Sequence, residues 1–191
     1  GYDYLMQAEA GYLHLSGEPG SPPARMGLSI VDYMTGITTA VAILSSLFGV
    51  LKGGCGHDID VSLFDVTLHQ LTYPGAWYLN SGYRTERLSR SAHPSTVPVQ
   101  LQRTADGWIF IMCMTQKFWV ELVRTLERPD LLTHADYATV EARRANRDAL
   151  TAVLDDVLST ATTADWLSRL QGVLPAAPVY DLPQALDNPY L

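Results

Sequence analysis

Apolar residues recur every three or four positions from residue 37 onward and predict the longest helix of the chain, over residues 33–51. The positions that share one face of this helix are Ile37, Val41, Leu44, Phe48 and Leu51. Other faces are apolar as well, so we expect the helix to lie between a sheet and another subunit. Its far side should be contacted by polypeptide outside residues 1–191, from another chain or from a further segment. Its most apolar part, residues 38–51, is only about fourteen residues long, which is too short to cross roughly 30 Å of hydrocarbon. The pattern therefore predicts no membrane segment.

The residues on either side of this helix predict further helices and one strand. A short helix is expected at Tyr2–Ala10, and Asp58–Leu63 alternates between polar and apolar positions as a strand does. A second long helix is predicted over Phe64–Leu79, where Pro74 should kink or end it. Helix, turn, strand and helix in succession are typical of an α/β domain. We therefore predict that residues 1–85 are part of such a domain.

Beyond residue 85 the predicted elements are shorter. The strands Pro98–Arg103 and Gly107–Met114 should form a hairpin, because Asp-Gly between apolar runs is a strong turn signal. Amphipathic helices and an extended segment follow at Gln116–Leu126, Asn146–Leu158, Trp166–Leu170 and Val173–Val179. Thr162 and Asp165 have the spacing of a capping box before the last of these helices. Residues 86–187 are accordingly predicted to form a small α+β domain.

The charge and cysteine content of the chain narrow the classes of function. A formal net charge of −7 argues against nucleic-acid binding, which requires a concentrated basic face. Charged residues make up only 17% of the chain, which indicates that part of its surface is covered by a partner or by further chain. Cys113, in an apolar run, is expected to be buried, and Cys55, in a glycine turn, to be exposed. Neither the cysteines nor the histidines have the spacing of metal ligands. Reduced thiols and the absence of a signal peptide favour a cytoplasmic location.

Asp32 is the residue whose position points most clearly to chemistry. It follows the apolar stretch Gly27–Val31 and opens the longest predicted helix. An aspartate at this position can be an N-cap that accepts hydrogen bonds from the first amides of the helix. It can also be a covalent nucleophile, because the positive end of a helix stabilises a carboxylate and ligands of α/β folds bind at strand-to-helix transitions. The spacing alone leaves both interpretations open.

Three blocks of sequence, taken together, resemble the family III CoA-transferases, which include formyl-CoA:oxalate transferase, the carnitine CoA-transferases and the α-methylacyl-CoA racemases. The blocks are Gly1-Tyr2-Asp3 with Ser16-Gly17-Glu18-Pro19, Asp32 and Thr35-Gly36; then Gly53–Asp65; then His93-Pro94-Ser95 with Thr104–Trp108 and Asn146-Arg147. They occur in order over nearly the whole chain, which makes the set more specific than any one of them.

The resemblance implies an activity and a role for each matching residue. Asp32 matches the family's nucleophile, which carries coenzyme A from an acyl-CoA donor to a carboxylic acid through an aspartyl-CoA intermediate. Tyr2 and Asp3 would contact coenzyme A, and His93, Pro94 and Ser95 would line the acceptor pocket. The coenzyme A thioester is then a substrate, and no tightly bound cofactor is expected.

The resemblance also implies an architecture. The family fold has a large Rossmann-like domain and a small domain, and two such subunits interlock as a homodimer. This chain would be the central segment of a subunit, with residues 188–191 starting the return to the large domain. The isolated segment could therefore lack activity.

Two alternative functions stay open. The racemases resemble Gly-His-Asp where this chain has Gly1-Tyr2-Asp3, and a phenol is a poor proton shuttle at neutral pH, so Tyr2 disfavours an acyl-CoA racemase or epimerase. The second alternative function is that of a non-catalytic fragment that binds CoA esters. The donor and acceptor are not identified by the sequence. The arginines 84, 87 and 90 could bind a dicarboxylate or could be ordinary solvated side chains.

Overall fold

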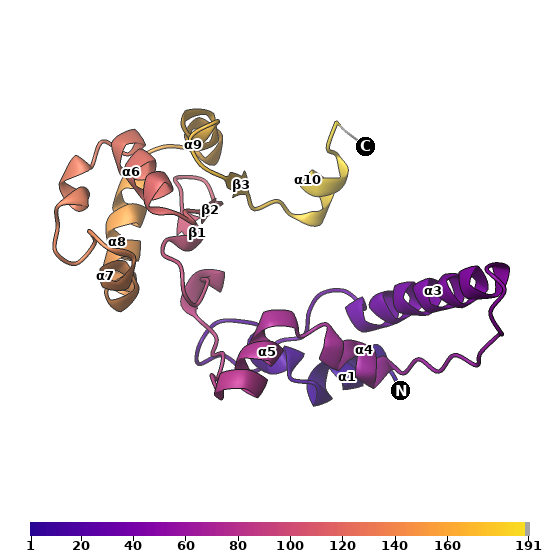
Figure 1. Cartoon of the computed structure of the whole chain (residues 1–191). Coiled ribbons are helices and arrows are strands. Elements are labelled where there is room, and N and C mark those ends of the chain that lie inside the picture. Colours follow the sequence, from indigo (N-terminus) through magenta and orange to yellow (C-terminus); the bar gives the residue numbers. More distant parts are fainter. Residues whose placement is uncertain (190–191) are drawn as a thin grey trace. The chain divides into compact units, whose positions relative to one another are not determined.

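The chain forms two compact units, and the boundary between them along the sequence falls between Arg87 and Leu88. The computed structural model describes residues 1–189 (Figure 1). The sequence places its boundary between residues 85 and 86, and the assignment of 1–85 and 86–187 as domains stays a prediction. Helices and a small sheet are both present, which confirms a mixed α and β architecture.

All regular secondary structure of the first unit is helical. Its helices are α1 (Asp3–Glu9), α2 (Tyr12–Leu15), α3 (Ile30–Leu51), α4 (Leu63–His69) and α5 (Thr72–Ser81). Helix α3 packs against α1 and α4. Because residues 1–87 contribute no strand, the Rossmann-like assignment stays a prediction.

The strand predicted at Asp58–Leu63 is wrong. Residues 54–62 have no regular secondary structure, and α4 begins at Leu63, where the Ser62 hydroxyl accepts a hydrogen bond from the Asp65 amide at 3.0 Å. A strand needs a neighbour to pair its backbone N–H and C=O groups, and the first unit offers none.

The single helix predicted at Phe64–Leu79 is divided into α4 and α5. The interruption falls at Gln70 and Leu71, because the ring of Pro74 conflicts with a helical carbonyl four positions earlier, as the predicted kink or end at Pro74 requires. Pro74 lies in the first turn of α5, where a backbone N–H would have no partner within the helix anyway.

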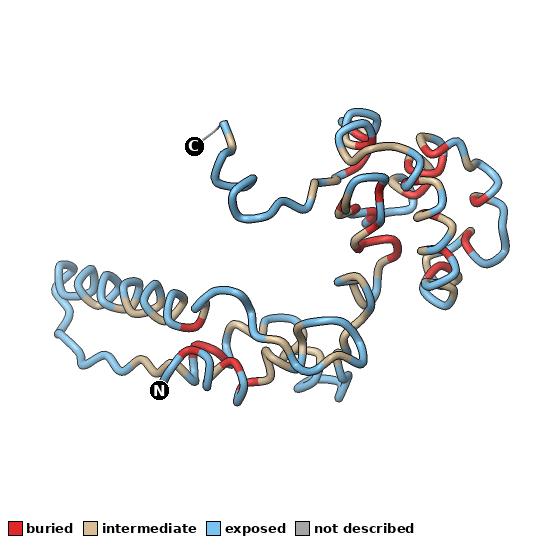
Figure 2. The backbone as a smooth tube through the Cα atoms, turned by 180° about the vertical axis from the view of Figure 1, so that it is seen from behind, coloured by how far each residue is buried: buried red, intermediate tan, exposed pale blue. Residues whose placement is uncertain are grey.

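Helix α3 corrects the predicted length of the apolar segment. It begins at Ile30 and has 22 residues, so it is long and apolar enough to cross a membrane by length and composition, a test that core helices of soluble proteins also pass. Within this chain Val31 is its one buried residue, and Figure 2 shows exposed positions along most of its length. Leu44, Phe48 and Leu51 are 66%, 62% and 83% exposed within this chain because no described element of the unit covers them. Contact of this helix with polypeptide outside residues 1–191 stays a prediction.

The second unit contains an antiparallel sheet and short helices. Its elements are η1 (Ser89–Ser91), β1 (Val99–Arg103), β2 (Trp108–Met112), α6 (Gln116–Thr125), η2 (Pro129–Leu132), α7 (Val140–Ala145), α8 (Arg147–Leu158), α9 (Thr163–Leu170), β3 (Ala176–Pro178) and α10 (Leu182–Leu186). The sheet order is β1-β2-β3. Arg103 pairs with Trp108 across the turn, which confirms the predicted hairpin. The core is built on Ile109, Ile111, Trp119, Leu122 and Leu154, all fully buried.

Helix α9 is held at its N-terminus by two acidic residues. Thr162 and Asp165 form the predicted capping box. The Asp106 carboxylate, in the hairpin turn, also accepts hydrogen bonds from the amide and hydroxyl of Thr163 at 2.8 and 2.9 Å. These bonds lower the pKa of Asp106. They join the turn between β1 and β2 to the start of α9.

The two thiols of the folded chain are expected to differ strongly in reactivity. Cys55 is exposed and Cys113 is buried, as the sequence predicts, and burial raises the pKa of the Cys113 thiol to about 12. Because the thiolate is the reactive form, iodoacetamide at pH 8 should alkylate Cys113 at least about 100-fold more slowly than Cys55. Peptide mass spectrometry measures both rates. In denaturant the rates should converge, and equal rates in the folded protein would contradict the buried position of Cys113.

Candidate active site

Asp32 lies in the first turn of α3, and its side chain is exposed. Its carboxylate makes no hydrogen bond or ion pair with any residue from 1 to 189. The N-cap position belongs to Ser29, whose side chain does not cap the helix. The interpretation of Asp32 as an N-cap is therefore wrong: its own amide is one of the groups that require a cap.

Asp3 supplies the cap from another helix. One oxygen of its carboxylate, Oδ2, accepts hydrogen bonds from the amides of Val31 at 2.7 Å and Asp32 at 3.1 Å. Asp3 opens α1 and is only 4% exposed. Sequence reasoning selected Asp3 for a different role, since no local pattern shows that a carboxylate caps a helix that begins 27 positions later. The predicted contact between Asp3 and coenzyme A stays a prediction.

Tyr2 is the residue next to this cap. It precedes α1 in an extended conformation, and its carbonyl accepts hydrogen bonds from the amides of Leu5 and Met6. Its side chain is 76% exposed. The structure thus brings Tyr2, Asp3 and the backbone of Asp32 together in the first unit, whereas His93, Pro94 and Ser95 lie in the second.

An apolar cavity of about 360 Å³ lies beside the first turn of α3. Most of its lining is apolar and includes Leu15, Met26, Ile30, Val31, Met34, Val66 and Leu71. Tyr12 also lines it and donates its hydroxyl proton to the Thr67 carbonyl at 2.9 Å. Burial raises the pKa of Tyr12, which keeps this phenol neutral. The cavity could therefore hold an apolar part of a ligand within one helical turn of Asp32.

The segment His93–Ser95 is held in place by an arginine of α8. Nη2 of Arg147 donates to the His93 carbonyl at 2.9 Å and to the Pro94 carbonyl at 3.5 Å. The His93 amide donates to the Val99 carbonyl at 2.9 Å, and the Ser95 amide donates to Nδ1 of His93 at 3.3 Å. Two separate parts of the third sequence block, His93-Pro94-Ser95 and Asn146-Arg147, are thus in direct contact.

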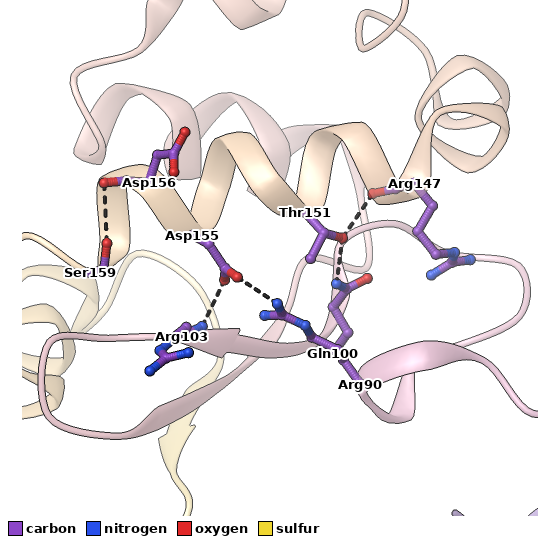
Figure 3. A network of polar contacts seen from close by, with 8 residues as sticks. All are labelled: Arg90, Gln100, Arg103, Arg147, Thr151, Asp155, Asp156 and Ser159. Atoms are coloured by element: carbon purple, nitrogen blue, oxygen red, sulfur yellow. Dashed lines mark hydrogen bonds and ion pairs between the residues drawn. The ribbon is translucent and has the colours of Figure 1, made fainter. Parts of the chain in front are cut away.

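A polar network joins α8 to β1 and η1 next to this segment (Figure 3). Thr151 accepts a hydrogen bond from Nε2 of Gln100 at 2.8 Å, and Asp155 accepts one from the Arg103 amide at 2.8 Å. Asp155 also forms an ion pair with Arg90 at 2.7 Å. A cavity of about 390 Å³ adjoins these residues. Several polar side chains that line this cavity form the hydrogen bonds and the ion pair that join α8 to β1 and η1.

The three arginines near residue 85 do not behave as one group. Arg90 pairs with Asp155, and Arg87 donates hydrogen bonds to the carbonyls of Ser16 and Pro22. Both are therefore only partly exposed, and the interpretation as solvated side chains is wrong for them. Arg84 is exposed and is the one of the three that is free to meet a ligand within the described chain.

No cluster of three or more His, Cys, Asp or Glu side chains that could hold a metal ion occurs among residues 1–189. Asp32 with its buried cap and the exposed Tyr2 form the candidate site of the first unit. The His93–Ser95 segment is a separate candidate site in the second unit.

Comparison with known proteins gives consistent matches over the whole chain. The model of the family described as CoA-transferase family III matches residues 1–191. An acyl-CoA transferase of Fusarium pseudograminearum is 32% identical over 99% of this chain and 41% of its own length. A succinyl-CoA:mesaconate CoA-transferase of Haloarcula hispanica is 30% identical over 100% of this chain and 47% of its own. The crystal structure of a CAIB/BAIF family protein from Brucella suis has a TM-score of 0.84 and 32% identity, over 100% of this chain and 50% of that one.

The chain spans about half the length of the relatives it matches.

Proposed function

The chain belongs to CoA-transferase family III, and on that premise we propose that its protein moves coenzyme A from an acyl-CoA donor to a carboxylic acid, with Asp32 as the covalent nucleophile. One observation carries the assignment to Asp32. It is an exposed carboxylate, without a partner in the described chain, on a helix turn whose amides are held by the buried Asp3.

The proposed reaction has four steps that balance without an oxidant or reductant. A carboxylate oxygen of Asp32 attacks the carbonyl carbon of the donor thioester, and the C–S bond breaks to give a mixed anhydride and CoA thiolate. The thiolate attacks Cγ of Asp32 and releases the donor acid as its carboxylate, leaving an aspartyl-CoA thioester. The acceptor carboxylate then attacks Cγ and expels the thiolate, and the thiolate attacks the acceptor's carbonyl carbon. This last step gives the new acyl-CoA and restores Asp32.

The position of Asp32 suits the charge changes in these steps. Each step passes through a tetrahedral centre with a negative oxygen at or beside the Asp32 carboxyl group. The N-terminus of α3 carries roughly half a positive elementary charge, which favours negative charge within the first turn. The Asp3 carboxylate already takes the amides of Val31 and Asp32, so only the remaining part of this charge acts on the Asp32 side chain. Preorganised dipoles of this kind stabilise a transition state without reorganisation during the reaction.

The proposed substrates follow from the names of the relatives, and the proposed binding positions are the His93–Ser95 segment and Tyr2. The Haloarcula hispanica relative bears the name of an enzyme that acts on succinyl-CoA, the thioester of a dicarboxylic acid, and on mesaconate, itself a dicarboxylate. This supports a dicarboxylate acceptor and a donor derived from a dicarboxylic acid. The His93–Ser95 segment is the proposed acceptor-binding loop, and Arg147 holds it in shape. Tyr2, rather than Asp3, has an exposed side chain available for coenzyme A.

The proposed assembly is a homodimer in which a second copy covers α3. The apolar side chains of α3 are exposed in this chain, with Val41 at 57% and Leu44 at 66%. Such a long apolar surface is unusual for a protein that stays a monomer in water. The interlocked arrangement of two subunits and a cytoplasmic location stay predictions.

Trapping of the intermediate tests the proposed function. The intact protein is incubated with succinyl-CoA and then with hydroxylamine, which converts an aspartyl thioester or anhydride into a hydroxamate. Peptide mass spectrometry should find the hydroxamate on Asp32 and on no other carboxylate. Coenzyme A transfer without any modified Asp32 would contradict the covalent route. Exchange of an α-proton of a 2-methylacyl-CoA with solvent deuterium, in the absence of transfer, would favour the racemase alternative.

A further inference from the structure

The first turn of α3 has no cap of its own and depends on α1. Four amides at the start of a helix lack partners within the helix. Here Oδ2 of Asp3 takes two of them, those of Val31 and Asp32. The second is the amide of the proposed nucleophile itself. The distance of 3.1 Å from Oδ2 to the Asp32 nitrogen therefore links the position of Asp32 directly to α1.

Gln7, one turn further along α1, completes the arrangement. Its Nε2 donates to the other oxygen of Asp3, Oδ1, at 2.6 Å and to the Leu28 carbonyl at 3.2 Å. Its Oε1 accepts a hydrogen bond from the Met26 amide at 3.1 Å. Gln7 is fully buried, at 0% exposure. Gln7 thus binds the segment that leads into α3, at Met26 and Leu28. Asp3 binds the first turn of α3, at Val31 and Asp32.

We propose that Asp3 and Gln7 form a buried clamp that positions the Asp32 carboxylate for attack on the thioester. The inference rests on the proposed function. Both residues act through Asp32 and are positioning residues, because their polar atoms are already used within the chain. A nucleophile on an unclamped helix end would sample directions that miss the thioester carbon, and a displacement of about 1 Å can reduce a rate about 100-fold.

The carboxylate of Asp3 also provides a way to test the clamp apart from side-chain packing. A carboxylate accepts charge-assisted hydrogen bonds, which are stronger than those of a neutral amide. Replacement by asparagine keeps the size of the side chain and one acceptor oxygen, but it weakens the bonds to the two amides. The variant should therefore fold, and its defect should lie in the chemical step and not in substrate binding.

The experiment measures intermediate formation and turnover in the intact protein with succinyl-CoA. In the Asp3→Asn variant, the single-turnover rate of Asp32 modification and kcat should both fall about 10- to 100-fold, with KM for succinyl-CoA changed less than about 3-fold. Asp3→Ala, which removes both acceptor oxygens, should be slower still. The matched control is Glu9→Gln, the same chemical change at an exposed position of α1, which should keep wild-type rates.

The outcomes separate this inference from the proposed function. Wild-type rates of Asp32 modification in Asp3→Asn would overturn the clamp alone. A wild-type protein that transfers coenzyme A without modification of Asp32 would overturn both the proposed function and the clamp. Should Asp3→Asn fail to fold, Gln7→Met provides the second test: it leaves Asp3 on the two amides and should slow modification about 3- to 10-fold. A wild-type rate in Gln7→Met would then overturn the proposal.

Discussion

Replacement of Asp32 by alanine in the intact protein is expected to leave less than about 1% of wild-type CoA transfer, because loss of a covalent nucleophile removes the whole reaction path. Asp32 has no partner in the described chain that its loss would leave unsatisfied, and its side chain is exposed. The variant should therefore keep the fold and the affinity for acyl-CoA. Steady-state transfer with succinyl-CoA, together with calorimetric titration of coenzyme A, measures the two properties separately.

The control for this prediction is a carboxylate in a similar position that has no proposed role. Glu141 lies in the first turn of α7 and is exposed. Glu141→Ala should retain nearly full turnover, and Asp32→Asn should be as inactive as Asp32→Ala. Residual transfer well above about 1% in a folded Asp32→Ala protein would mean that coenzyme A moves by a route without this nucleophile.

Replacement of Arg143 by alanine is expected to lower the free energy of unfolding of the second unit by about 3–5 kcal/mol. The Arg143 side chain is 1% exposed and stacks on Trp119, with its guanidinium carbon 4.7 Å from the ring centre. It donates to the carbonyls of Val97 and Tyr137, each at 2.9 Å, and to Oε1 of Gln116 at 3.0 Å. Burial lowers the pKa of this guanidinium, which nevertheless stays protonated at neutral pH.

The size of the expected effect follows from what the substitution leaves behind. Alanine would leave three acceptors without their donor, at about 1–3 kcal/mol for each buried one, and would add a cavity beside Trp119. Urea unfolding followed by tryptophan fluorescence should show a midpoint lower by about 1.5 M or more. Arg143→Lys should also be strongly destabilised, because one ammonium cannot span acceptors placed for a planar fork.

The neighbouring residue provides the matched control. Arg144 is exposed, and its replacement by alanine should change the free energy of unfolding by less than about 0.5 kcal/mol. Equal midpoints for Arg143→Ala and Arg144→Ala would show that the buried hydrogen bonds of Arg143 contribute little to the stability of the second unit.

Elements that depend only on neighbouring residues could be predicted from the sequence. The β1–β2 hairpin, helix α6, helix α8 and the Thr162–Asp165 capping box were all predicted, because turn residues, caps and apolar periodicity act over a few positions. The family was also identified from the sequence, and Asp32 was selected as the candidate nucleophile from its place before an apolar helix and from the family pattern. These features need no knowledge of what lies across the fold.

Features that join distant parts of the chain could not be predicted from the sequence, because they depend on how the elements pack. The segment 58–62 alternates as a strand does, yet it is irregular because the first unit provides no strand to pair with it. Capping of α3 falls to Asp3, 29 positions before Asp32, because the packing of α1 against α3 brings a buried carboxylate to the free amides. Arg143 becomes a buried hub for the same reason: its acceptors come from three separate segments, and no local pattern can show where they meet.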